Sequence, residues 1–216
     1  MRFGVLGTGP VGTTIGSKLV QLGHEVTVGS RTSGNVRAHE WVESTGDAAR
    51  AGTFSDAAYF GQMIFNCVAG VHTLEALEAA RRSNLQGKVV VDVANPLDFS
   101  QGMPPTLSVC NTDSLGEQIQ RVFPECRVVK TLNTMNHSVM VDPASVPGSH
   151  NVFVCGSYDE AKSDTIAVLE SFGWPRPRIV DLGPISASRG MEMYVALWLS
   201  LYGAVGGPHF NIAVTS

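Results

Sequence analysis

The chain has 216 residues, of which 44% are hydrophobic and 16% are charged, and its formal net charge is −4. This is enough apolar material for one core, built as one large domain or as one domain with a small addition. The mild acidity and the lack of a basic block argue against nucleic acid or an anionic membrane as a partner. The apolar stretch from Tyr194 to Val205 contains glycine and is too short to span a bilayer. Because the first predicted strand starts at residue 2 and leaves no room for a signal peptide, we expect a cytoplasmic protein.

A glycine-rich run follows the first predicted strand, residues 2–6, and begins an amphipathic helix from Val11 to Leu22. Strand, G-x-G-x-x-G and helix in this order form the dinucleotide-binding fingerprint. Gly7 permits the tight turn, Gly9 lets the backbone approach the pyrophosphate, and Gly12 allows close packing of helix on strand. The helix N-terminus can then face the diphosphate. The candidate cofactor contacts in this run are Gly7, Thr8, Gly9, Pro10, Val11 and Gly12.

The residues after the second predicted strand, Glu25 to Val28, distinguish NADP from NAD. An NAD-specific protein places an Asp or Glu there to bind the ribose 2′-hydroxyl, whereas this chain has Gly29. Ser30 and Arg31 follow, with a hydroxyl and a planar guanidinium suited to a 2′-phosphate. The alternative is that Arg31 is an ordinary solvated arginine. The missing carboxylate favours NADP(H).

Strands and helices continue to alternate along the chain, which predicts an α/β protein with a Rossmann-type doubly wound parallel sheet. A capping box, Ser114 with Glu117, is expected to start one of the helices. Strands ending near Gly70, Val93 and Lys130 would be parallel to the first, so their C-terminal ends share the edge where ligands collect. The expected helices cover residues 35–44, 73–82 and 114–123, and the further expected strands lie around residue 53 and at 63–68, 88–93 and 127–130.

A turn-rich segment, Asp142 to Ser149, is a candidate boundary. We expect an NADP-binding Rossmann domain over residues 1–141 and a small C-terminal α/β annex over 151–216 that packs on the sheet. The annex would contain a strand at 151–155, a helix capped by Ser157 and ending at Gly173, a strand at 178–181, and a long helix at 187–203.

The long last helix carries a stripe of large apolar side chains, which is core or an intersubunit contact. We expect a homodimer, because this stripe exceeds what so small an annex can bury. Its members are Met191, Met193, Tyr194, Leu197, Trp198, Leu201 and Tyr202.

The cysteines and histidines show no spacing typical of a metal site or a catalytic cluster, so no metal is expected. Cys67, Cys110, Cys126 and Cys155 are interpreted as reduced and mostly buried, although a catalytic thiol is the alternative. Among the histidines only His137 lies near a plausible site, either as a surface or capping residue or in an acid–base role.

Several short motifs resemble those of one family. They are Gly7-x-Gly9-x-Val11-Gly12, Gly23-His24-Glu25-Val26, Gly29-Ser30-Arg31, Val154-Cys155-Gly156 and Asp181-Leu182-Gly183-Pro184 with Ser188-Arg189. They resemble the NADP oxidoreductases dependent on the deazaflavin coenzyme F420, nearly end to end, and least between residues 97 and 126. The resemblance implies hydride exchange between NADP(H) and the deazaflavin, with the two rings stacked in an apolar cleft. The cytoplasmic domain of the six-transmembrane ferric reductases, a relative, uses flavin.

The resemblance also implies roles for single residues. Thr8 to Gly12 would hold the diphosphate, Ser30 with Arg31 the 2′-phosphate, and Ala69 would flank the path of the adenosine or nicotinamide. Asn35, with Arg37 close by, stands near the place of a further family cation. The other candidate cofactor contacts are Val68, Asn95, Pro96 and Met135.

An acceptor site is expected where three segments meet after strands of the parallel sheet: Ala69-Gly70, Asn95-Pro96 and Asn133 to Met135. The last segment resembles one that carries a histidine in place of Asn133. As the candidate catalytic residue, Asn133 would position a carboxamide or an acceptor carbonyl, and Lys130 could do the same if it faces the cleft. The alternative for each is a bond to its own loop.

Three functions of different classes remain open. The first is an NADP(H)-dependent oxidoreductase that passes hydride to a deazaflavin, a flavin or another small acceptor. The second is a reductase of imine or keto substrates, which the missing general acid disfavours. The third is a redox sensor that binds NADPH without turnover, which stays open because a fold fixes no activity.

Overall fold

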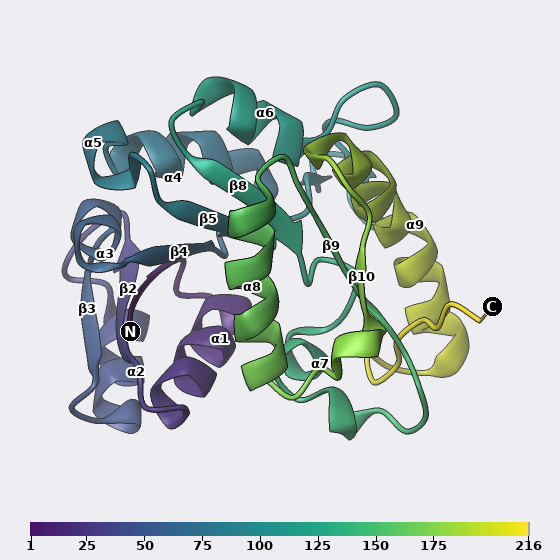
Figure 1. Ribbon diagram of the computed structural model, residues 1–216, viewed down its shortest axis with the longest axis horizontal. Coiled ribbons are helices and arrows are strands. Elements are labelled where there is room, and N and C mark those ends of the chain that lie inside the picture. The colour runs from purple at the N-terminus through teal and green to yellow at the C-terminus, as the bar shows by residue number, and fades with distance from the viewer. Residues whose placement is uncertain (216) are drawn as a thin grey trace.

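An eight-stranded sheet runs through the centre of the computed structural model, which describes residues 1–215 (Figure 1). The strand order is β10-β9-β8-β5-β4-β1-β2-β3. The strands are β1 (Arg2–Leu6), β2 (Glu25–Ser30), β3 (Ala49–Thr53), β4 (Met63–Asn66), β5 (Val89–Asp92), β8 (Arg127–Thr131), β9 (Val152–Gly156) and β10 (Ile179–Asp181). From β3 to β8 all neighbours are parallel, which confirms the Rossmann-type prediction.

Helices cover both faces of the sheet. The apolar strands bury side chains on both sides, as parallel strands with helical crossovers do, and one hydrophobic core forms on each face. α1 (Pro10–Gln21), α2 (Val36–Thr45), α7 (His137–Val141) and α8 (Asp159–Ser171) pack on one core. α3 (Phe54–Phe60), α4 (Thr73–Ala79), α5 (Arg82–Leu85), α6 (Leu115–Val122) and the start of α9 (Ser188–Val205) pack on the other.

One predicted helix start, one predicted capping box and one predicted helix length need correction, whereas α6 does start after Ser114 as predicted. Ser157 does not cap α8: the chain stays extended through Tyr158, and no side chain caps the helix. Ser114 Oγ accepts from Glu117 N at 3.2 Å, but the Glu117 carboxylate binds Ser114 Oγ and Arg189 instead of completing the capping box. The helix expected over residues 73–82 is interrupted, because Arg81 adopts a positive φ of 69° between α4 and α5.

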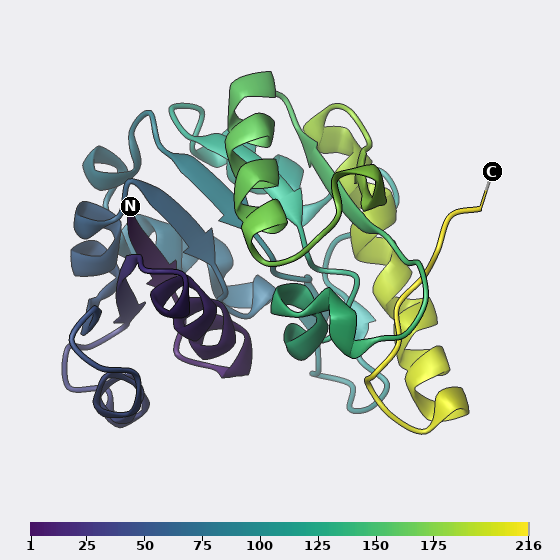
Figure 2. The ribbon, with the colours of Figure 1, turned by 60° about the horizontal axis from the view of Figure 1, so that its bottom comes forward.

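The segment after β8 reverses direction before it rejoins the sheet. β9 pairs with β8 in antiparallel fashion, and β10 pairs in parallel with β9 (Figure 1). α9 then runs behind the β9–β10 end of the sheet, and the C-terminal segment turns back alongside this helix (Figure 2). Asn151 N donates to Ile212 O at 2.9 Å and Val214 N donates to Asn151 Oδ1 at 2.8 Å, so this C-terminal segment is tied to the start of β9.

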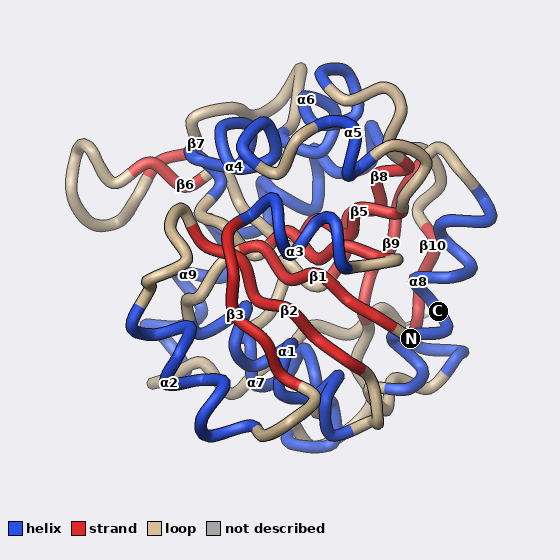
Figure 3. The backbone as a smooth tube through the Cα atoms, turned by 90° about the vertical axis from the view of Figure 1, so that its left-hand side faces the viewer, coloured by secondary structure: helices blue, strands red, loops and turns tan. Residues whose placement is uncertain are grey.

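A short hairpin projects from the body beside the C-terminal edge of the parallel strands (Figure 3). It consists of β6 (Leu97–Asp98) and β7 (Thr106–Leu107), each two residues long. Within residues 1–215, no helix has the length and apolar character needed to cross a membrane. The cytoplasmic location stays a prediction.

Candidate cofactor and acceptor site

The glycine-rich loop has one glycine that the protein's own packing does not require. A Cβ at Gly7 would come 2.7 Å from Cys67 O, and φ there is 114°; a Cβ at Gly12 would come 2.1 Å from Gly7 O. Gly9 lies at the N-cap of α1 with extended dihedrals, and a Cβ there would meet nothing within 4 Å. The open space over Gly9, at a helix N-terminus, fits a diphosphate. The residues present therefore fit a dinucleotide.

A cavity of about 620 Å³ extends from this loop along the ends of β1, β2 and β4. Its polar lining includes Ser30 and two guanidinium groups, Arg31 and Arg37, and no carboxylate. Neither guanidinium forms an ion pair with a carboxylate within residues 1–215. Two exposed cations without partners suit a dianionic 2′-phosphate. The lining residues are Gly7, Thr8, Gly9, Ser30, Arg31, Thr32, Asn35, Arg37, Phe54, Cys67, Val68, Ala69 and His72.

Two polar side chains of this cavity, Ser30 and Asn35, already form hydrogen bonds within the protein. Ser30 Oγ donates to Thr32 O at 2.6 Å, so the hydroxyl must turn before it can donate to a phosphate. Asn35 is the N-cap of α2, and its Oδ1 accepts from Ala38 N at 3.0 Å. Asn35 thus lines the cavity and also caps α2. Arg37 is the cation near this place in the cavity wall.

A second cavity, of about 470 Å³, adjoins the first and shares Cys67, Val68, Ala69 and His72 with it. Its lining contains no Asp, Glu, Lys or Arg. It brings together the ends of β4, β5 and β8, the hairpin, α7 and α9. The lining residues are Val11, Cys67, Val68, Ala69, Gly70, Val71, His72, Val93, Ala94, Asn95, Leu97, Phe99, Asn133, Met135, Asn136, His137, Met140 and Trp198.

Most of the residues predicted as cofactor contacts line one of these two cavities. Pro10, Gly12 and Pro96 line neither. Gly12 allows the close approach of α1 to the loop. The loops after β4 and β5 touch each other, since a Cβ at Gly70 would come 2.2 Å from Asn95 O, and Pro96 is buried at this contact. These glycine and proline positions shape the site without forming its wall.

Asn133 lines the second cavity with one of its polar atoms unused. Its Nδ2 donates to Asn95 Oδ1 at 2.9 Å and to Met191 O at 3.0 Å, and Asn95 Nδ2 donates back to Asn133 O at 2.8 Å. The residue is 4% exposed, and its Oδ1 has no partner within residues 1–215. Because a buried unpaired acceptor is costly, an N–H group of a ligand is the natural partner for this oxygen.

Lys130 does not line either cavity. It is fully buried, and its Nζ lies 2.7 Å from Asp92 Oδ2, 2.8 Å from Glu192 Oε1 and 2.5 Å from Ala94 O. Burial alone would lower the pKa of Lys130, but the two carboxylates reverse this, so the pKa is raised and the ammonium stays charged. Glu192 also accepts from Leu115 N at 2.8 Å and Gly116 N at 3.0 Å. Lys130 therefore fastens α9 and α6 to the sheet.

Few groups in the second cavity can exchange a proton near neutral pH. His137 Nδ1 is hydrogen-bonded to Thr14 Oγ1 at 2.9 Å, and partial burial lowers the pKa of His137, which keeps the ring neutral at pH 7. Burial raises the pKa of the Cys67 thiol far above neutrality.

All four cysteines are free, and three of them lie outside the cavities. Cys126 and Cys155 are buried, and burial raises the pKa of each to about 12. Cys110 is exposed.

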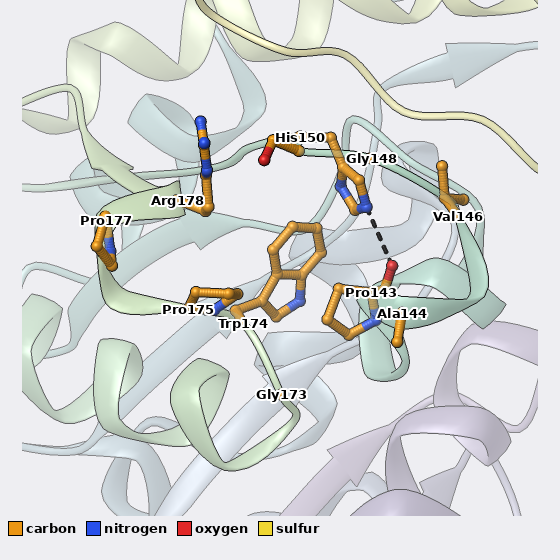
Figure 4. A pocket seen from close by; sticks show the side chains of 11 residues that line it. Pro143, Ala144, Val146, Gly148, His150, Gly173, Trp174, Pro175, Pro177 and Arg178 are labelled. Atoms are coloured by element: carbon orange, nitrogen blue, oxygen red, sulfur yellow. Dashed lines mark hydrogen bonds between the residues drawn. The ribbon is translucent and has the colours of Figure 1, made fainter.

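A third cavity, of about 370 Å³, lies apart from this site between the η2 turn (Pro143–Ser145) and the end of α8 (Figure 4). His150 crosses the edge of Trp174 there, with ring centroids 5.2 Å apart. His150 Nε2 donates to Pro143 O at 3.0 Å, and Asn211 Nδ2 donates to His150 Nδ1 at 2.9 Å. Both ring nitrogens are thus engaged, Nε2 with the η2 turn and Nδ1 with the C-terminal segment.

Phe99, Trp198 and His72 line the cavities although the sequence did not predict them there. Phe99 and Trp198 reach the second cavity from the hairpin and from α9, and no local pattern marks either as a ligand contact. His72 follows the end of β4 and lines both cavities. The place of a residue just after a parallel strand is the signal that could have identified it.

The glycine loop, the cationic cavity and the adjoining apolar cavity together define an oxidoreductase of Rossmann type. Comparisons with known proteins agree. The family model described as NADP oxidoreductase, coenzyme F420-dependent, matches residues 2–96. A crystal structure from Arthrobacter sp. FB24, provisionally named an F420-dependent NADP reductase, is 46% identical with full coverage of both chains and a TM-score of 0.94. The chain belongs to this family of F420-dependent NADP oxidoreductases, and it is an NADP-dependent enzyme.

More distant relatives are reductases with lower sequence identity to this chain. The F420-dependent NADP reductase of Methanocaldococcus jannaschii is 28% identical over 93% of this chain and 92% of its own. The rat metalloreductase STEAP3 is 27% identical over 88% of this chain, which spans 36% of that protein. An imine reductase of Streptomyces aurantiacus, 18% identical over 95% of this chain and 63% of its own with a TM-score of 0.67, shares the fold. The predicted family and NADP(H) as cofactor are confirmed.

Proposed function

We propose that this protein transfers a hydride between NADPH and a planar acceptor of the deazaflavin or flavin type. The observation that carries this proposal is the pair of adjoining cavities. One has cations and an open glycine loop, and the other is large enough for an aromatic ring system and has no charged Asp, Glu, Lys or Arg in its lining. The names of the family and of the Methanocaldococcus relative support coenzyme F420 as the acceptor.

The chemistry needs little from the protein beyond binding and orientation. When bound, NADPH would supply a hydride, one hydrogen nucleus with two electrons, leaving NADP⁺, and the acceptor would gain that hydride and one proton from solvent. Asn133 Oδ1 would accept from a ring or carboxamide N–H and fix its position. Val11, Val93 and Met135 would exclude water from the ring faces. Holding two rings in contact supplies the proximity on which the rate depends.

Reduction of an imine or a ketone is the less favoured function. It normally requires a proton donor at the substrate, and the lowered pKa of His137 favours the neutral imidazole, which is a weak acid. The solved imine reductases share the fold at low identity, so their activity does not carry over.

The direct test offers F420, FMN, FAD and riboflavin in turn with NADPH that carries deuterium at C4. We expect deuterium in reduced F420, because a deazaflavin accepts the hydride at carbon. A flavin accepts it at nitrogen and exchanges the label with water, so flavin reduction is monitored by the loss of visible absorbance, with NADP⁺ formed in equal amount. If none of the four is reduced while NADPH still binds, the proposal is wrong. Reduction of imines or ketones alone would favour the reductase alternative.

We also propose that α9 forms the contact of a homodimer. Four of its large apolar side chains are exposed: Met193 (38%), Leu197 (56%), Tyr202 (45%) and Val205 (59%). Such a patch on one helix is typical of an interface. Leu197→Glu should yield a monomer by light scattering at micromolar concentration, whereas Tyr59→Glu, exposed on α3, should not change the mass. A wild-type monomer would refute the proposal.

A further inference from the structure

We propose that Phe99 is an acceptor-binding residue that, together with Trp198, forms an aromatic wall of the acceptor cavity and stacks on a fused-ring acceptor. The inference rests on the proposed function, because it takes the acceptor to be a planar ring system. It concerns a hairpin for which the family resemblance predicts no role.

Phe99 presents an apolar ring that the protein itself does not cover. The residue is 56% exposed, yet it lines the 470 Å³ cavity. An aromatic side chain gains most from burial against another ring, in an offset or edge-to-face arrangement. A planar acceptor seated in the cavity would bury this ring, and the stack would exclude water from one face of the acceptor.

The position of Phe99 is linked to the acceptor edge through the backbone. The hairpin begins directly after Pro96, and Ser108 returns to it: Ser108 N and Oγ both donate to Pro96 O, at 2.8 and 3.2 Å. Leu97 N donates to Asn95 O at 2.8 Å, and Asn95 is the partner of Asn133. The base of the hairpin is therefore fixed, while its far end projects from the body (Figure 3).

Trp198 supplies the second aromatic group from α9, and it is supported from outside the cavity. Its indole stacks on Phe210, with centroids 5.4 Å apart and planes at 24°, and contacts Tyr202 at 5.6 Å. Phe210 belongs to the C-terminal segment that Asn211 ties to His150. Trp198 Nε1 is buried and has no partner within residues 1–215.

The unused Nε1–H of Trp198 and the unused Asn133 Oδ1 are a donor and an acceptor, both on residues that line this cavity. A heteroaromatic ring with a carbonyl and an N–H on its edge would complement both. The pairing favours a pyrimidinedione-type ring edge, which deazaflavins and flavins share, over a purely hydrocarbon ring.

The test compares Phe99→Ala with Phe99→Tyr and with Met103→Ala. Met103 lies on the same hairpin and is 74% exposed but does not line the cavity, so it is the matched control. The dissociation constants of F420 and FMN are measured in the presence of NADP⁺, where no turnover occurs, followed by kcat and KM with NADPH. We expect Phe99→Ala to raise the dissociation constant and KM of the better acceptor about tenfold, with NADPH affinity within twofold. Phe99→Tyr and Met103→Ala should behave as the wild type.

Equal acceptor affinity in Phe99→Ala and Met103→Ala would overturn the inference, as would an equal loss of NADPH affinity. Failure of the proposed function gives a different result: the wild type would bind F420 or FMN without reducing it. In that event a weaker complex with Phe99→Ala would still support the aromatic wall. If the wild type binds neither acceptor, both proposals are wrong.

Discussion

The two cavities of the site are built in different ways. All lining residues of the NADP cavity come from the span between Gly7 and His72, and most of them lie at or just after the C-terminal ends of β1, β2 and β4. The acceptor cavity draws on residues from Val11 to Trp198, brought together by β5, β8, the hairpin, α7 and α9. The first cavity depends on local backbone geometry, and the second depends on long-range packing. Substitutions should therefore affect cofactor and acceptor separately, and this can be tested.

The largest effect should come from the buried ion network that holds the acceptor side together. Lys130→Met leaves Asp92 and Glu192 buried without their cation, and removing one partner of a buried pair costs about 3–5 kcal/mol. Urea unfolding measures this loss. Lys162→Met is the control: its ammonium is also buried, but its carboxylate partners Asp159 and Asp181 reach solvent and stay hydrated without it, so the loss should be smaller. Equal losses in the two variants would contradict the structural role of Lys130.

Matched substitutions in the glycine loop separate binding from folding. Gly9→Val enters open space and should leave the free energy of unfolding within about 1 kcal/mol, the range of N-cap exchanges. It should weaken NADPH at least a hundredfold, about 2.8 kcal/mol, by blocking the diphosphate. Gly12→Val forces a Cβ to within 2.1 Å of Gly7 O and should destabilise the fold even without ligand. Calorimetry and thermal unfolding check both, and NADPH binding by Gly9→Val at wild-type affinity would refute the diphosphate assignment.

The choice of NADPH over NADH should depend on the guanidinium groups after β2. Arg31→Ala should cost about 1.5–3 kcal/mol of NADPH affinity, the range for hydrogen bonds to charged groups, and leave NADH nearly unchanged. Titration calorimetry with both dinucleotides provides the measurement. A parallel loss for both would indicate misfolding, and no loss for either would leave Arg37 as the phosphate ligand.

On the acceptor side, Asn133→Ala should lower kcat about tenfold, or about 1.4 kcal/mol. It removes the unpaired Oδ1 together with the bonds to Asn95 and Met191. NADPH affinity should stay within a few fold, because the phosphate contacts lie in the other cavity. An unchanged kcat, or a kcat that falls only with NADPH affinity, would remove Asn133 from the reaction.

The smallest effect concerns the surface of α6 and depends on pH. Hydrogen bonds from Arg121 lower the pKa of Asp113 to about 2. A carboxyl whose pKa is lowered on folding stabilises the protein above its unfolded pKa of about 4, and this stability is lost as the pH falls towards 2. Asp113→Asn should therefore cost about 0.2–1 kcal/mol at pH 7, the range for exposed pairs, and almost nothing at pH 2. A difference that is constant from pH 7 to pH 2 would contradict this.

The sequence predicts the NADP side well because its signals are short-range. Gly7, Gly9 and Gly12 lie between one strand and one helix, and the absence of an acidic residue at Gly29 is visible without any tertiary information. The strand–helix alternation likewise predicts the parallel sheet through β8. The local capping pattern at Ser157 fails, since the extended backbone at Tyr158 delays α8.

The acceptor side could not be predicted to the same depth. No local pattern between β8 and β9 indicates that β9 runs antiparallel to β8. The direction of β9 in turn decides where α9 lies. Lys130 precedes the predicted acceptor loop, but only the buried carboxylate of Glu192, far along the chain, shows that its charge is used inside the fold. Phe99 and Trp198 carry no local signal because their role arises from a cavity that several distant elements share.

The antiparallel pairing of β9 with β8 has a consequence for how the chain can be made and cut. Until residues 152–156 are present, β8 is an open edge of nearly continuous buried residues, a template for pairing with another chain. Lys130 at that edge would also lack Glu192. During synthesis, the NADP-binding loop is therefore complete while the β8 edge of the sheet is still uncovered, until β9 and α9 have been synthesised. A fragment that stops at residue 141 should aggregate although every residue of its NADP cavity is intact.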